Sequence, residues 1–143
     1  MADIAVENYK KNVERATKSF GDKMDDIGKK LAPLLEEYNK LVANKTPSAD
    51  EKKRLTDIAK QIEDCHKAMD KAALEMKVDL MLLDPPKNAD PKELKKLPDW
   101  LSDIIKKKGL PLGKGVSVAP DIDFDFKAMK FKKAGVTFTI DLK

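Results

Sequence analysis

The sequence predicts a mostly helical α+β fold: a long antiparallel helical hairpin, coiled-coil-like, followed by a short helix and a small antiparallel β-meander. Three observations lead to this prediction. Apolar residues recur every three or four positions in the first half, prolines interrupt the chain near residue 85, and apolar and polar residues alternate from residue 116 onward. The expected divisions are a hairpin over 1–84, a Pro-rich link over 85–97, and a helix with a meander over 98–143.

The first half carries two narrow apolar stripes with helical spacing, over residues 9–41 and 55–80. Narrow stripes are typical of the seam of a coiled coil rather than the broad face of a globular helix. Ser48 and Glu51 have the spacing of a capping box, so the second helix is expected to begin there. The short connection makes the two helices antiparallel neighbours. Pro33 lies inside the first stripe, and a kink is expected about one turn before it.

The C-terminal part begins with a short predicted helix. Pro98 suits its first turn, Gly109 suits its end, and Trp100 belongs to its apolar face. From Val116 onward the alternation indicates two or three short strands, with Phe124 and Phe126 expected on the buried face. An aspartate-bearing strand beside a lysine-bearing one would pair opposite charges on the exposed face. The helix that carries Trp100 is the expected cover for the apolar face of the strands.

The chain is weakly basic, with 29 Lys and Arg against 25 Asp and Glu, and all of this excess lies in residues 85–143. Its single cysteine, Cys65, cannot form an internal disulfide. No secretory signal peptide is visible, and the longest apolar run, Leu80 to Leu83, is far too short to span a membrane. The expected location is the cytoplasm, although export without a signal peptide would leave the same sequence.

The sequence shows no catalytic, cofactor or metal site. The aspartates at alternate positions from Asp121 to Asp125 resemble the start of a calcium loop but lack its glycine and its final glutamate. The glycine-rich stretch 109–115 has the wrong spacing for a phosphate loop. Cys65 and His66 are neighbours on a helix and point about 100° apart, so they cannot act as a nucleophile–base pair. The chain is therefore not expected to be an enzyme.

The hairpin suggests a function in protein binding. The C-terminal segment is expected to cover little more than one end of it, so another protein or a second copy, in a homodimer, would cover the rest. The predicted class is an adaptor, a chaperone-like escort, an inhibitor or an assembly component. The residues predicted to bind the partner lie on the two stripes and are Phe20, Met24, Ile27, Ile62, Met69 and Met76. The edge of the last strand, Val136 to Leu142, is a second candidate surface.

Two alternatives remain open. In the first alternative the chain is a structural subunit of a larger assembly. In the second it binds nucleic acid or another anionic surface through its basic C-terminal part. Binding of the second kind would weaken steeply with added salt. The residues that would bind the anion are Lys106, Lys107, Lys108, Lys114, Lys130, Lys132 and Lys133.

Overall fold

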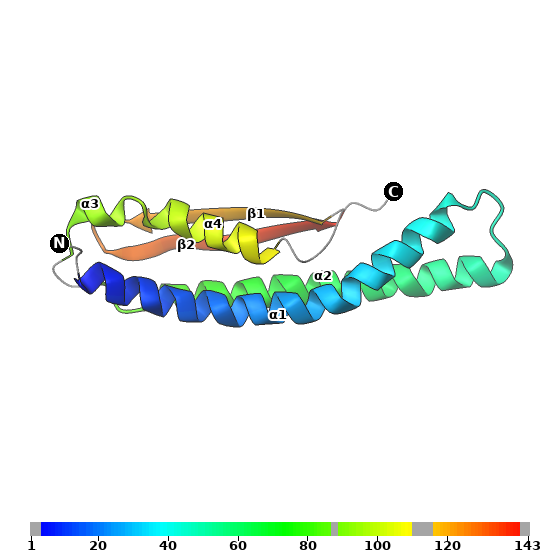
Figure 1. The fold of residues 1–143 in the computed structure, drawn as a ribbon, viewed down its shortest axis with the longest axis horizontal. Coiled ribbons are helices and arrows are strands. Elements are labelled where there is room, and N and C mark those ends of the chain that lie inside the picture. The colour runs from blue at the N-terminus through cyan, green and yellow to red at the C-terminus, as the bar shows by residue number, and fades with distance from the viewer. Residues whose placement is uncertain (1–3, 87–88, 110–115, 141–143) are drawn as a thin grey trace.

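The computed structural model describes residues 4–86, 89–109 and 116–140, which form two layers (Figure 1). A long helical hairpin makes one layer, and the remaining helices and a two-stranded antiparallel sheet lie on one side of it. The predicted fold class is thereby confirmed. In chain order the elements are α1 (Ile4–Ala43), α2 (Ala49–Met81), α3 (Pro91–Leu94), α4 (Leu97–Gly109), β1 (Val116–Asp125) and β2 (Lys130–Ile140).

The connection between α1 and α2 confirms the predicted capping box. The Ser48 side chain accepts a hydrogen bond from the Glu51 amide at 3.1 Å, and the Glu51 carboxylate accepts one from the Ser48 amide at 3.2 Å. The Asn44 side chain also donates to the Glu51 carboxylate at 2.9 Å. These bonds satisfy amide groups that the first turn of α2 would otherwise leave unpaired, and they fix the direction in which α2 leaves the turn.

Replacing Ser48 with alanine is expected to lower the free energy of unfolding by about 1 kcal/mol, because α2 loses its N-cap acceptor. Urea denaturation followed by circular dichroism measures this loss. The matched control is Ser19→Ala, since Ser19 is exposed in the middle of α1; it should change the free energy by no more than about 0.5 kcal/mol. Equal effects of the two substitutions would show that the capping box contributes nothing.

The C-terminal part of α1, which contains Pro33, changes direction. Figure 1 shows this part turning toward the side of the hairpin that carries the sheet. Proline removes one helical hydrogen bond and crowds the preceding turn, which explains the bend. Leu35 of α1 and Ile58 of α2 are both buried in this region, and Arg54 of α2 donates hydrogen bonds of 2.7 and 2.9 Å to the Glu37 carboxylate of α1, which join the two helices toward the hairpin turn.

The sheet covers more of the hairpin than the sequence predicted. It has two strands of 10 and 11 residues in place of two or three short ones. At about 3.3 Å per residue they extend for about 33 Å, which is more than half the length of the hairpin. The strand β2 packs on α2, while α4 packs on β1 and on α1. The expectation that the C-terminal segment covers little more than one end of the hairpin is therefore wrong.

Aromatic side chains join the two layers. The ring of Phe20 on α1 stacks on that of Phe138 on β2, with the ring centroids 6.2 Å apart. The ring of Tyr9 lies 6.2 Å from that of Phe124 on β1 and 6.0 Å from that of Phe131 on β2. All five side chains are buried, so the apolar face of the sheet forms one core with the hairpin.

The turn between the strands differs in one respect from the prediction. The strand register shifts between Asp123 and Phe124, and β1 ends at Asp125. Phe126 therefore lies past the end of the strand and is 40% exposed, in place of the buried position expected for it. The Asp125 carboxylate accepts hydrogen bonds from the amides of Ala128 and Lys127, and these bonds lower the pKa of Asp125 and hold the turn together.

Candidate functional site

The hairpin residues predicted to bind a partner lie inside the chain. Ile27 is half-buried and packs against the core, while the other five are at most 2% exposed. They belong to the core that the two helices and the sheet form together, so they cannot contact a partner unless that core opens. The buried residues are Phe20, Met24, Ile62, Met69 and Met76.

A different part of α2 exposes apolar side chains to solvent. Leu74 is 58% exposed, Val78 46%, Met81 40% and Leu82, the C-cap residue, 76%. Leu74, Val78 and Met81 follow one another at spacings of four and three residues and so lie on one face of the helix, and Leu82 comes directly after its last turn. We refer to these four residues as the outer patch.

The outer patch lies on the side of α2 that faces away from the core. Residues two positions apart on a helix are rotated by roughly 200° about the helix axis, so Val78 points away from both Met76 and Leu80. Met76 and Leu80 are fully buried against the rest of the chain. The last turns of α2 are therefore apolar on both sides, which is the composition of a helix buried between two layers. Only one of those layers belongs to the described part of the chain.

Charged residues of both signs surround the outer patch. Glu75 forms an ion pair with Lys23 of α1 and so connects the two helices of the hairpin. Lys71 and Asp79 are exposed, and Lys77 is partly exposed. The surface is thus an apolar centre with a mixed polar rim, the usual anatomy of a protein-binding surface.

The lysines predicted to bind anions do not lie on one surface. Lys106 and Lys107 lie in the last turn of α4, whereas Lys130, Lys132 and Lys133 lie at the start of β2. Figure 1 shows that α4 runs away from the β1–β2 turn, so these two groups are at opposite ends of the sheet. A polyanion would therefore meet no continuous basic stripe formed by these five side chains. The two other lysines of the predicted set, whose side chains lie outside the described ones, are Lys108 and Lys114.

The sheet register also pairs lysines with acidic residues. Lys133 lies opposite Asp123, and Lys130 lies opposite Asp125. This arrangement confirms that the aspartate-bearing and lysine-bearing strands are neighbours. It also lowers the net positive charge of this end of the sheet, since each lysine has a carboxylate across the ladder.

One backbone carbonyl of β2 is hydrogen-bonded to α2. Nε2 of His66 lies 2.8 Å from the carbonyl oxygen of Phe138. A carbonyl oxygen can only accept, so Nε2 carries the proton and donates. This hydrogen bond occupies the strand edge at Phe138, which leaves less of the predicted Val136 to Leu142 edge open to a partner strand. Leu142 itself lies outside the described residues.

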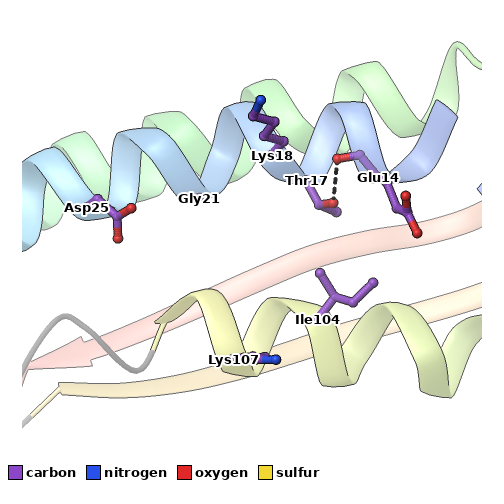
Figure 2. Close-up of a pocket in the computed structure, with 7 residues that line it drawn as sticks. All are labelled: Glu14, Thr17, Lys18, Gly21, Asp25, Ile104 and Lys107. Atoms are coloured by element: carbon purple, nitrogen blue, oxygen red, sulfur yellow. Dashed lines mark hydrogen bonds between the residues drawn. The ribbon is translucent and has the colours of Figure 1, made fainter. Parts of the chain in front are cut away.

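A groove of about 550 Å³ lies between α1 and α4 (Figure 2). Figure 2 shows Ile104 pointing from α4 toward α1, with Glu14 and Asp25 directed into the space between the helices. The hydroxyl of Thr17 donates a hydrogen bond to the Glu14 carbonyl at 2.9 Å, so it is already engaged by the backbone. The lining residues therefore provide no nucleophile paired with a base. They are Glu14, Thr17, Lys18, Gly21, Asp25, Ile104 and Lys107.

Cys65 has the character of a packed thiol. Burial raises the pKa of the Cys65 thiol, and this effect exceeds the opposing one of nearby Lys30. The protonated thiol is a weak nucleophile, and the neighbouring His66 donates to Phe138 rather than to the sulfur. Among the described residues, no three His, Cys, Asp or Glu side chains are grouped so that they could hold a metal ion. Of the helices described, none has the length and apolar content needed to cross a membrane.

No family model, no curated protein and no solved structure matches this chain. Function is therefore inferred from the geometry and chemistry of the chain itself.

Proposed function

We propose that this chain is a non-catalytic protein-interaction module that binds through the outer patch of α2. The observation that supports this is the exposure of four neighbouring apolar side chains, 40–76% each, on a helix whose opposite side is fully buried. Soluble proteins rarely expose a contiguous apolar patch larger than roughly a few hundred Å², and patches above that size usually mark a surface that binds a partner.

The proposal replaces the stripe residues with the outer patch and keeps the functional class. An adaptor, an escort, an inhibitor and an assembly component all need a surface of this kind, and none of them needs a reactive group. The capping box and the ion pair between Glu75 and Lys23 stabilise the hairpin in its folded form. The partner would then meet a preformed helix and would not have to order it, which reduces the entropic cost of binding.

Replacing Val78 with glutamate is expected to abolish partner binding while the chain remains folded. The substitution places a charge at the centre of the outer patch, where a partner would have to desolvate it. The measurement is an affinity capture with the tagged chain, in the presence of an untagged copy of itself and native lysate. Nuclease treatment removes proteins that are held only through nucleic acid.

The matched control is Val42→Glu. Val42 is 40% exposed, close to the 46% of Val78, but it lies near the hairpin turn and outside the outer patch. A protein retained by the wild type and by Val42→Glu, and lost by Val78→Glu, supports the proposal. Identical capture by all three chains contradicts it. Loss of every captured protein on nuclease treatment favours the nucleic-acid alternative.

A further inference from the structure

We infer that a second copy of this chain covers the outer patch, with the two α2 helices antiparallel about a two-fold axis near Val78. The inference rests on the proposed function and names its partner. Val78 lies in the middle of the patch, with Leu74 on one side and Met81 and Leu82 on the other. An axis at this point places Val78 against Val78 and brings Leu74 of one copy level with Leu82 of the other.

The rim of the patch carries charges of both signs. A two-fold interface brings a surface against itself, so a rim of one sign would repel its own copy. Here the exposed residues Lys71 and Asp79 flank the patch, together with the exposed Asp70 and the partly exposed Lys77. Positive and negative groups are therefore both present on the rim. A bilayer of anionic lipids fits this surface less well, because it would repel the aspartates.

The direction of the pairing follows from the ends of α2. The N-terminal side of the patch carries Lys71, together with Lys67, which is paired with Glu63, and Asp70, whereas the last turn of the helix has no basic residue. Asp84, just beyond the helix, is exposed. The carboxyl end of a helix carries a partial negative charge. An antiparallel pair places the lysines of one copy toward the carboxyl end of the other, whereas a parallel pair would bring like ends together.

The size of the patch sets the strength of the association. A stable dimer buries about 800 Å² on each partner, and four side chains on one helix face cover less than this. We therefore expect a concentration-dependent dimer with a dissociation constant of roughly 10–100 μM, the range of transient associations. At such an affinity the chain would be monomeric at low concentration and dimeric where its local concentration is high.

Disulfide crosslinking tests the geometry of the pair. Cys65→Ser removes the native thiol, and Val78→Cys in that background places one thiol next to the axis. Mild oxidation at about 100 μM chain, near the expected dissociation constant, should give a covalent dimer at least tenfold faster than for Val42→Cys in the same background. Equal rates for the two variants would overturn the inference.

The same method distinguishes antiparallel from parallel pairing. In the antiparallel pair, two copies of residue 74 are offset by about 12 Å along the helix, too far for a disulfide, while residue 74 of one copy faces residue 82 of the other. A mixture of Leu74→Cys and Leu82→Cys chains should therefore crosslink to a heterodimer, and Leu74→Cys alone should crosslink slowly. Leu74→Cys crosslinking alone as fast as Val78→Cys would contradict the antiparallel arrangement.

Sedimentation of the unmodified chains separates this inference from the proposed function. We expect the dissociation constant of the dimer to rise at least tenfold in Val78→Glu and to be unchanged in Val42→Glu. A wild-type chain that stays monomeric at millimolar concentration overturns the inference. If such a monomer still captures another protein that Val78→Glu loses, the second copy is the wrong partner and the proposed function stands. If Val78→Glu loses nothing, both are wrong.

Discussion

Replacing Phe20 with alanine is expected to lower the free energy of unfolding by about 3–5 kcal/mol, the usual cost of removing a buried phenylalanine side chain. Phe20 is 1% exposed, and its ring stacks on that of Phe138 where α1 meets the sheet. The alanine variant would leave a cavity between the layers, and the surrounding helices and strands can close it only in part. Denaturant titration monitored by circular dichroism measures the loss.

The matched control makes the same substitution at an exposed phenylalanine. Phe126→Ala removes a side chain that is 40% exposed and whose one ring contact among the aromatic residues described is a T-shaped contact with Phe124. It should cost about 1 kcal/mol or less. Suppose instead that Phe20→Ala unfolds like the wild type and loses a binding partner. Phe20 would then belong to an interface, as the sequence suggested, and the packing of the sheet on the hairpin would be wrong.

The helices could be predicted from the sequence because their signals are local. A spacing of three or four residues fixes the side of the helix that is buried, and the pair Ser48 and Glu51 marks the start of α2 through bonds between neighbours in the chain. The short helix that begins beside Pro98 and the alternation after Val116 are local signals of the same kind. Each of these features depends on residues fewer than about ten positions apart.

The surface that remains exposed could not be predicted in this way. The stripe residues and the outer patch are both apolar, and the spacing of Met69 and Met76 does not distinguish a core from an interface. Which side of α2 is covered depends on where β2 packs, and β2 lies more than 45 residues further along the chain. A sequence signal for the outer patch does exist. From Ala72 to Leu83 only Glu75, Lys77 and Asp79 are charged, so the helix is apolar around most of its circumference.

Tyr9 is expected to make the fold sensitive to alkaline pH, and Tyr9→Phe should remove that sensitivity. The side chain is 3% exposed, and its hydroxyl has no hydrogen-bond partner among the described residues. Burial raises the pKa of Tyr9 from 10.0 to about 12, because the phenolate would lose its contact with water. Phenylalanine keeps the ring contacts with Phe124 and Phe131 and has no ionisable group.

The direction of the effect follows from proton binding. Below pH 10 the phenol is neutral in both the folded and the unfolded chain, so its titration takes nothing from the free energy of unfolding. Between pH 10 and 12 the unfolded chain releases the proton while the folded chain keeps it, and the free energy of unfolding falls by about 1.4 kcal/mol per pH unit, or roughly 3 kcal/mol in all. Tyr9→Phe avoids this loss. At pH 7 it should already be about 1 kcal/mol more stable than the wild type, because the buried hydroxyl is unsatisfied.

Urea denaturation of the wild type and of Tyr9→Phe, at pH values from 7 to 12, measures the gap between the two chains in free energy of unfolding. Other groups also titrate in this range, but they are common to both chains and cancel in the difference. Tyr38→Phe, which removes the other tyrosine hydroxyl from a half-buried position, is the control. A gap that widens above pH 10 only for Tyr9→Phe places the unpaired hydroxyl in the core between the hairpin and the sheet. A gap that stays constant up to pH 12 would mean that water reaches the hydroxyl in the folded chain, and that the two layers are less tightly closed at this end of the sheet than the burial of Tyr9 requires.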